Sequence, residues 1–142
     1  MKIQKVKNVR TPERGTSKSA GLDFFVPENF KGVHFLTNGE DLLIESGIVA
    51  EIPKGHALIF KEKSSTSTKH KLHIGACVVD EDYQGEILIH IFNFGNDVAE
   101  VQAGMKIAQA VLVPVLCEDV EVVEKINFEI SERGDGRLGS TD

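Results

Sequence analysis

The chain reads Ile87-Leu88-Ile89-His90-Ile91-Phe92 at one place and Ile107-Ala108-Gln109-Ala110-Val111-Leu112-Val113 further on. Both runs are short, almost continuously apolar and rich in β-branched residues, which is typical of strands covered on both faces. Residues 42–52 and 57–60 have the composition of further strands. Many short strands in one chain favour an all-β fold, either a sandwich, a jelly roll or a barrel.

Turn-forming residues separate these runs at short intervals, as expected where short strands follow one another. They stand at Pro27, Asn38-Gly39, Pro53-Lys54-Gly55, Asp82 to Gly85, Gly95-Asn96-Asp97 and Ala103-Gly104. Residues 120–130 alternate apolar and polar side chains, which predicts a half-buried strand. Residues 64–72 are polar and open with Ser64, a candidate helix N-cap, so we expect a short helix or a functional loop there.

Composition and charge exclude several classes of protein. The 142 residues suffice for one domain with one core, and 41% hydrophobic and 27% charged residues are ordinary values for a soluble globular chain. The formal net charge is −6, so the chain lacks the excess of basic residues that is typical of a nucleic-acid binder. No run approaches the ~20 apolar residues of a membrane span, and no signal-peptide pattern opens the chain. We therefore expect a cytoplasmic protein that binds neither nucleic acid nor a membrane.

The only two cysteines, Cys77 and Cys117, are expected to be reduced thiols, and no Cys/His spacing resembles a zinc site. The chain divides into a single β domain, residues 1–130, and a C-terminal arm, residues 131–142. The arm holds three glycines and almost no apolar side chain, so it cannot form a core of its own. It fits a frayed terminus, or equally a flexible arm that orders on an anion through glycine amides, hydroxyls and two arginines.

Two polar segments carry candidate chemistry. The first, Asp80 to Gly85, holds three acids and Tyr83 between apolar runs, and a solvated hairpin turn would explain it. A carboxylate held at a strand end would also be able to deprotonate a water, with Gly85 admitting a ligand and Tyr83 packing against a sugar. The second, residues 61–71, gathers cations and hydroxyls. It fits a solvated loop or, if Ser64 begins a helix, an anion site.

Two further segments hold one polar residue each in apolar surroundings. Asp23 lies within Ala20-Gly21-Leu22-Asp23-Phe24-Phe25, and an acid in such a run needs a partner or a metal. Gln109 lies near the start of the run 107–113, and either residue has a purely structural explanation when taken alone.

In their order along the chain, these segments resemble the five motifs of the trimeric dUTPase family. The matching stretches are Ala20-Gly21-Leu22-Asp23; Lys63-Ser64-Ser65 followed by Lys69-His70; Ala76 to Glu86; Gly104-Met105-Lys106-Ile107-Ala108-Gln109; and Arg133 to Thr141. The third and fifth are the most specific. The resemblance spans residues 20–141, which is nearly the whole chain.

The resemblance implies a jelly-roll-like β-clip barrel with one short helix, a homotrimer, and Mg²⁺-dependent hydrolysis of dUTP to dUMP and pyrophosphate. Water attacks the α-phosphorus in that reaction. Asp80, Gln109 and Asp23 correspond to catalytic positions: Asp80 to the residue that positions the attacking water, and Asp23 to an acid supporting the water and metal network. Phosphates and water would hold the Mg²⁺, with Asp23 in its outer shell and no direct protein ligand.

The substrate-binding positions of the family fall on both the β domain and the arm. Tyr83 corresponds to the residue that excludes ribose, and the arm corresponds to one that closes over the γ-phosphate, usually in a neighbouring subunit's site. The matching residues are Lys63, Ser64, Ser65, Tyr83, Gly85, Arg133, Arg137, Leu138, Gly139, Ser140 and Thr141.

The chain departs from the family pattern at several of these places. Lys63 and Leu138 replace an arginine and a uracil-stacking phenylalanine, Ile74 replaces an asparagine, and Arg137 replaces a glycine. Cys77 and Gln84 also differ from the usual residues. These departures bear on base recognition and arm closure more than on hydrolysis.

Three other functions are therefore considered. One is a dUTPase-like protein that binds regulatory partners, and another is a related diphosphatase with a shifted base preference. A dCTP deaminase, which shares the fold, is disfavoured because Glu81-Asp82 replaces that family's Pro-Gly. His90 also stands where the deaminases have their catalytic glutamate.

Overall fold

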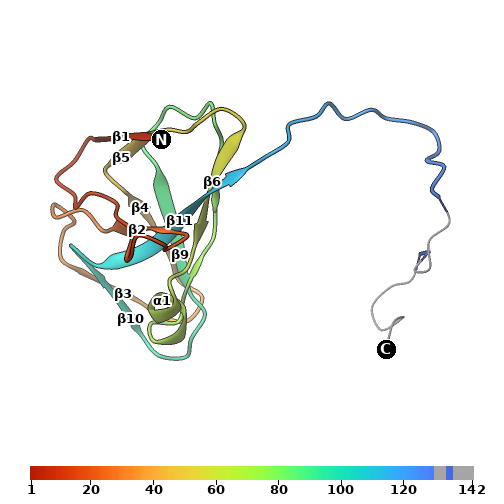
Figure 1. Ribbon diagram of the computed structural model, residues 1–142. Coiled ribbons are helices and arrows are strands. Elements are labelled where there is room, and N and C mark those ends of the chain that lie inside the picture. The colour runs from red at the N-terminus through yellow and green to blue at the C-terminus, as the bar shows by residue number, and fades with distance from the viewer. Residues whose placement is uncertain (130–133, 136–142) are drawn as a thin grey trace.

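The computed structural model describes residues 1–129 and 134–135 as short antiparallel strands and one short helix (Figure 1). This confirms the all-β expectation. The elements are β1 Lys2–Lys5, β2 Leu22–Phe25, β3 Val33–Leu36, β4 Asp41–Glu45, β5 Ile48–Glu51, β6 His56–Lys61, α1 Ser64–Thr68, β7 Leu72–Ile74, β8 Val78–Val79, β9 Leu88–Asn93, β10 Ala99–Gln102 and β11 Lys106–Pro114.

The described strands pair into four small sheets, in the orders β2-β11-β6-β8, β4-β9-β7, β1-β5 and β10-β3. Strand β11 lies at the centre of the largest sheet, with β2 on one side and β6 on the other. Its register to β2 shifts between Lys106 and Ala108, an irregularity of the kind that bends a strand. The predicted buried run 107–113 is thus β11, and both its faces are at least partly covered.

One apolar core lies between the sheets. Phe24 of β2 and Phe60 of β6 meet edge to face with ring centroids 4.8 Å apart, a favoured aromatic geometry. The largest fully buried side chains come from both of the larger sheets and their neighbours, namely Phe24, Phe25, Val26, Ile44, Ile48, Leu58, Leu72, Ile87, Ile89, Ile91, Val101 and Ile107.

Two strand predictions need correction. The run 87–92 supplies most of β9, but only alternate side chains of the strand are buried: Leu88 is exposed and His90 and Phe92 are partly exposed, so one face is only partly covered in the single chain. Residues 42–52 are two strands, β4 and β5. Gly47 separates them with a φ of 74°, a conformation that side-chain-bearing residues rarely adopt.

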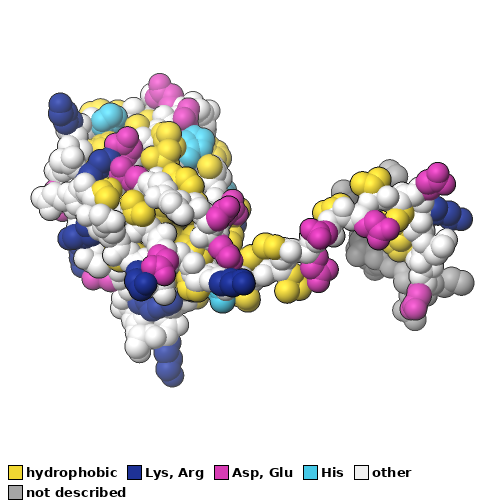
Figure 2. All heavy atoms as spheres, turned by 90° about the horizontal axis from the view of Figure 1, so that it is seen from above, with side chains coloured by type: hydrophobic (Ala, Val, Ile, Leu, Met, Phe, Trp, Pro, Cys, Tyr) yellow, Lys and Arg dark blue, Asp and Glu magenta, His cyan; other side chains and the backbone are white. Residues whose placement is uncertain are grey.

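The prediction of a half-buried strand over residues 120–130 is wrong for the described single chain. No strand is assigned from Val115 to Glu129, and the segment leads away from the body (Figures 1 and 2). Val120, Val122 and Phe128 expose 89%, 92% and 82% of their surface. Alternation marks a segment suited to a sheet, but a strand forms only where a partner strand supplies the hydrogen bonds.

Two smaller expectations can be compared with the structure. Both cysteines, Cys77 and Cys117, are free, as the sequence predicts. In the part of the chain that is described, no helix is long and apolar enough to cross a membrane.

Candidate functional site

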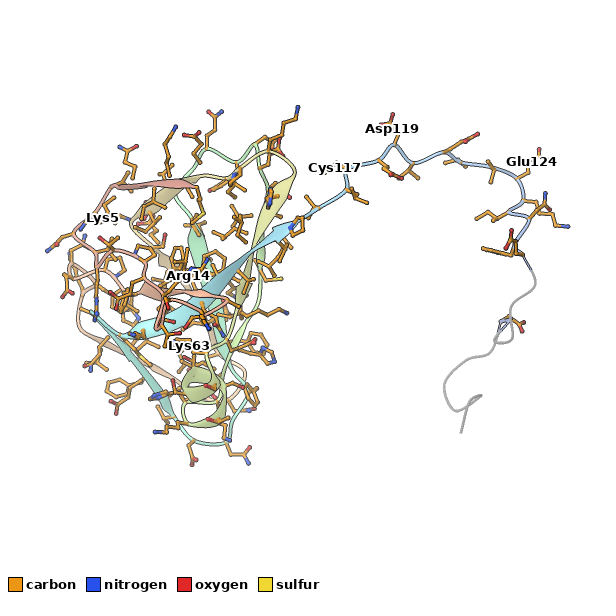
Figure 3. The ribbon with its side chains drawn as sticks, in the orientation of Figure 1. Lys5, Arg14, Lys63, Cys117, Asp119 and Glu124 are labelled. Atoms are coloured by element: carbon orange, nitrogen blue, oxygen red, sulfur yellow. The ribbon has the colours of Figure 1, made fainter. Side chains whose placement is uncertain are left out.

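Three segments far apart in the sequence meet at one end of the central sheet. In the register of β11, Gln109 pairs with Asp23 of β2 on one side and with Lys61 of β6 on the other. Lys63 follows β6 and lies beside α1 (Figure 3). We call the group Asp23, Glu62, Lys63, Lys106 and Gln109 the Asp23 edge.

Asp23 is a buried carboxylate with two lysine partners. Its Oδ1 accepts a hydrogen bond from Lys63 Nζ, and its Oδ2 accepts one from Lys106 Nζ at 2.8 Å. Burial alone would raise the pKa of Asp23, but the two lysines outweigh burial and hold the pKa below its ordinary value. Asp23 is therefore a fixed negative charge, and the three groups together carry one net positive charge.

The amide of Gln109 is held in the same place. Its Nε2 donates to the carbonyl oxygen of Glu62 at 2.9 Å. The Glu62 carboxylate reaches strand β7, where it contacts His73 Nδ1 and accepts a hydrogen bond from the Ile74 amide at 2.9 Å. Burial would raise the pKa of Glu62, but the Ile74 amide and His73 lower it overall.

The Asp80 hairpin, residues 80–86, follows strand β8. The Tyr83 amide donates to the Asp80 carbonyl at 3.2 Å and closes a turn. Within the described chain the Asp80 carboxylate has no hydrogen-bond or ion-pair partner, and it is exposed. A hollow of about 190 Å³ lies beside it and is lined by Phe60, Ala76, Val78, Val79, Asp80, Tyr83, Ile87 and Leu88.

The hairpin is held at its ends. The Glu81 carboxylate accepts from the Gly55 amide, while Glu86 Oε1 accepts from Lys7 Nζ at 2.9 Å and from the Gly47 amide at 2.6 Å. Desolvation would lower the pKa of Lys7, but its contacts with Glu45 and Glu86 raise it. These anchors fix where the turn leaves the sheet and leave its tip open.

Tyr83 folds back over Gly85. Its hydroxyl donates to the Glu86 carbonyl at 2.8 Å, and a Cβ added to Gly85 would lie 2.5 Å from that hydroxyl oxygen. The sequence suggested that Gly85 admits a ligand. In the structure, the missing side chain makes room for the Tyr83 ring.

The Asp23 edge and the Asp80 hairpin lie at opposite ends of β6. Val79 pairs with Leu58, which puts Asp80 at the level of Ala57, whereas Gln109 pairs with Lys61. Ala57 and Lys61 are four residues apart, or ~13 Å at about 3.3 Å per residue. One chain therefore does not bring Asp80 and Gln109 to the same atom of a ligand.

The basic segment forms a helix, but the cap differs from the prediction. Lys63 is the N-cap residue without a side-chain cap hydrogen bond, and Ser64 is the first helical residue. The side chains of Ser64 and Ser65 are exposed beside the Asp23 edge. The predicted arm residues Arg133, Arg137, Leu138, Gly139, Ser140 and Thr141 lie outside the described residues.

Sequence reasoning missed three parts of these two groups. Lys106 lies in the stretch Gly104 to Gln109, and the rule that a buried acid needs a partner would have drawn attention to it beside Asp23. Glu62 and Glu86 gave no local signal, because their partners lie 12 and 79 residues away. Among residues 1–129 and 134–135, no three His, Cys, Asp or Glu side chains form a metal-binding group.

Comparison with known sequences identifies relatives over almost the whole chain. A sequence model described as dUTPase matches residues 7–142. The deoxyuridine 5'-triphosphate nucleotidohydrolase of Rattus norvegicus is 33% identical over 130 residues, which are 92% of this chain and 60% of the rat protein. That of Yarrowia lipolytica is 34% identical over 94% of this chain and 83% of its own length.

Solved structures agree with the fold. A mutant dUTPase of Staphylococcus bacteriophage 80alpha, solved with dUpNHpp, has a TM-score of 0.84 and 26% identity, covering 99% of this chain and 96% of its own. A mutant dUTPase of phage phi11 of S. aureus, described with a structural Mg(II) ion, has a TM-score of 0.75 and 24% identity, covering 89% and 98%. From the matched length and these relatives, the chain belongs to the dUTPase family.

Proposed function

We propose that this protein hydrolyses dUTP to dUMP and pyrophosphate, with Mg²⁺, in sites assembled between the copies of a homotrimer. The observation that carries the proposal is that one chain holds two complementary groups: a cationic, amide-bearing edge, and a hairpin with Tyr83 and with Asp80, whose carboxylate has no partner among the described residues. These are the groups that hydrolysis of a phosphate anhydride requires, since positioning and charge neutralisation provide most of its catalysis.

Each half of the site has one task. At the hairpin, Asp80 accepts a proton from the water that attacks the α-phosphorus, and Tyr83 packs where a ribose 2′-hydroxyl would sit. At the Asp23 edge, Lys63, Ser64, Ser65 and Gln109 bind phosphate oxygens. Lys106 retains Asp23 when Lys63 turns to the phosphate, so the buried carboxylate keeps a partner throughout.

The chemistry of the described side chains fits a Mg²⁺ ion that is chelated by the triphosphate. Such an ion keeps several waters and needs few protein ligands. With Lys63 moved to the phosphate, Asp23 would be able to bond the water shell of the ion. The bound ion would neutralise phosphate charge and polarise the α-phosphorus.

The distance between the two halves supports a site shared between chains. A general base must lie within about 3 Å of its proton, or one water away. The ~13 Å between the levels of Asp80 and Gln109 on β6 is too long for both to serve one phosphorus. A hairpin from one copy facing the Asp23 edge of another satisfies both requirements.

The exposed C-terminal segment also supports association. Leu116, Val120, Val122, Ile126 and Phe128 are exposed, and they recur along 13 residues that lack a partner strand in the described chain. An apolar, alternating segment of this kind is expected to pair with a sheet of a neighbouring copy. It would also carry the arm, with Arg133 and Arg137, toward another copy's site.

The activity is tested by incubating the protein and Mg²⁺ separately with dUTP, dCTP, dTTP and UTP and measuring pyrophosphate. We expect release from dUTP alone. Comparable release from a second nucleotide would favour a diphosphatase with another base preference, which the replacements Ile74 and Leu138 make a specific alternative. Silence on all four nucleotides would contradict the enzyme and favour a binding protein.

The shared site is tested by mixing two variants of reduced activity, Asp80→Asn and Gln109→Ala, during refolding. If each site takes Asp80 and Gln109 from different copies, about a quarter of the sites in an equimolar mixture hold both native residues and activity returns. If both residues came from one chain, no mixture would be more active than the average of the two variants. Light scattering measures the oligomer, and fractionation tests the predicted cytoplasmic location.

A further inference from the structure

The side-chain amide of Gln109 has its two ends in different surroundings. Nε2 donates one of its two N–H groups to the Glu62 carbonyl at 2.9 Å. Oε1 lies against Gly21. A Cβ added to Gly21 would be 2.5 Å from Gln109 Oε1 and 3.2 Å from Gln109 Cδ. Only an N–H group bonds favourably to a carbonyl oxygen, so this contact fixes which end is which.

The orientation has a chemical consequence. A flipped amide would set its own carbonyl oxygen against the Glu62 carbonyl oxygen, and two acceptors repel each other. In the observed orientation the second N–H of Gln109 has no acceptor among the described residues and is available to an anion. The flipped orientation would instead present a carbonyl oxygen, which a phosphate rejects.

Glu62 is itself fixed by a second strand. Its carboxylate accepts from the Ile74 amide at 2.9 Å and contacts His73, whose ring stacks on Phe92 with centroids 5.5 Å apart. The Glu62 side chain is only 17% exposed. The peptide between β6 and α1 is thus tied to β7, and its carbonyl cannot easily turn away from Gln109.

Gly21 acts from the opposite side. The nearest atoms to a Cβ at this position all belong to Gln109, at 2.5, 3.1 and 3.2 Å. Any side chain at residue 21 would therefore push the amide of Gln109 away before it disturbed another residue. The close approach explains why glycine stands here, because its φ lies outside the left-handed region.

We propose that Gly21 and Glu62 are positioning residues that hold the Gln109 amide so that it presents an N–H group, and not its oxygen, to the substrate phosphates. The inference rests on the proposed function for the identity of the anion. The arrangement of the amide itself depends only on the described contacts. Gly21 supplies the space and Glu62 supplies the acceptor.

A double-variant cycle tests Gly21, with binding of the nonhydrolysable analogue dUpNHpp and Mg²⁺ measured by calorimetry. We expect Gly21→Ala to weaken binding about tenfold, the loss of one hydrogen bond to a charged group. In a Gln109→Ala background the same change should cost nothing, because no amide remains to displace. Equal losses in both backgrounds, or no loss in either, would overturn the role of Gly21.

Gly15→Ala is the matched control. A Cβ at Gly15 would meet only Ser19 Oγ at 3.6 Å, an ordinary contact. This variant should bind the analogue as the native protein does. A loss equal to that of Gly21→Ala would mean that the N-terminal segment tolerates no alanine at all, and the explanation through Gln109 would be wrong.

Glu62 is tested by comparing Glu62→Gln with Glu62→Ala. Glutamine keeps an oxygen that can accept from the Ile74 amide, so we expect binding within about twofold of native for Glu62→Gln and about tenfold weaker binding for Glu62→Ala. Equal losses would overturn the assignment, since the negative charge of Glu62 beside His73 would then matter and not the position of the Glu62 carbonyl.

The ¹⁵N side-chain resonance of Gln109, assigned with Gln109→Ala, separates this inference from the proposed function. It should shift in Gly21→Ala and Glu62→Ala and stay in place in Gly15→Ala, whether or not a nucleotide binds. If the native protein ignores dUTP but these shifts occur, the proposed function fails and the positioning of the amide stands. Unchanged shifts would overturn the positioning.

Discussion

The Asp23 edge and the Asp80 hairpin lie at opposite ends of β6 and differ in how far their polar groups are already bonded. The Asp23 side chain is 7% exposed, and both of its carboxylate oxygens have lysine partners. Asp80 is exposed and, within the described residues, its carboxylate has no partner. The difference follows from burial, because a buried charge must be paired in the folded chain, whereas an exposed one is paired by water.

The two groups of residues are held in place by different contacts. The Asp23 edge is organised by its own chain, through β2, β6, β7 and β11, before any ligand arrives. The Asp80 hairpin is anchored at Glu81 and Glu86 and open between them. With no partner among the described residues, the Asp80 carboxylate can accept a proton from water more readily than the salt-bridged Asp23 can. In the proposed enzyme, the base and the phosphate-binding surface would therefore stay apart until two copies meet.

The largest expected effect comes from the open half. Asp80→Asn removes the proposed proton acceptor but keeps the size and exposure of the side chain. General-base groups contribute typically 10²–10⁴-fold, so we expect kcat for dUTP to fall by about 10³-fold. Affinity for dUpNHpp should stay within a few fold, and rapid-quench and calorimetric measurements read the two quantities separately.

Glu81→Gln is a neighbouring control on the same turn, since it removes a charge but retains an acceptor for the Gly55 amide. Its kcat should remain close to native. Substantial turnover in Asp80→Asn would show that Asp80 is not the base. The Asp23 edge and the Asp80 hairpin would then differ only in how exposed their carboxylates are.

The next effect concerns stability and the paired half. Asp23→Ala leaves Lys63 and Lys106 without their shared partner, but these side chains are 22% and 39% exposed and regain some hydration. We therefore expect a loss of about 2 kcal/mol in the free energy of unfolding, below the ~3–5 kcal/mol typical of fully buried pairs. Urea titration measures it, and a loss under ~0.5 kcal/mol would contradict a preformed edge.

The lowered pKa of Asp23 predicts a pH dependence of that stabilisation. A carboxyl whose pKa is lower in the folded than in the unfolded chain binds more protons when unfolded. Its contribution is therefore complete above the ordinary pKa of 3.8, declines below it and is lost once the folded pKa is passed. The stability difference between native protein and Asp23→Ala should be constant from pH 5 to 7 and shrink below about pH 4. A difference that grew on acidification would reverse the sign.

The local parts of this architecture could be predicted from sequence, and the long-range parts could not. Apolar runs located most of β9 and β11, and the ordered motifs predicted Asp23, Lys63, Asp80 and Gln109 as site residues. The register that sets Gln109 between Asp23 and Lys61 depends on strand pairing, for which the motifs carry no code.

Two errors have the same physical origin. The partly open face of β9 and the missing strand over 120–129 both concern segments whose apolar side chains read as covered in sequence. In the described single chain the β9 face is covered only in part, where Phe92 stacks on His73, and the apolar side chains over 120–128 are largely exposed. Hydrophobic periodicity reports that a surface is to be buried, and it does not report whether the covering strand belongs to the same chain.

The smallest expected effect concerns the packing of Tyr83 against Gly85 on the Asp80 hairpin. Gly85→Ala places a Cβ 2.5 Å from the Tyr83 hydroxyl oxygen, so the ring must tilt and lose its bond to the Glu86 carbonyl. Tyr83→Phe loses the same bond but leaves the ring its space. One neutral hydrogen bond is worth about 1 kcal/mol, so either change costs little in stability, roughly fivefold in the folding equilibrium.

The two variants should differ in the ratio of kcat/KM for dUTP to that for UTP. Gly85→Ala should lower that ratio severalfold, because the ring no longer occupies the ribose position, while Tyr83→Phe should leave it nearly unchanged. Equally lowered ratios in both variants would mean that the hydroxyl bond, and not the space above Gly85, positions the ring, and unchanged ratios in both would contradict a role of the ring in excluding ribose.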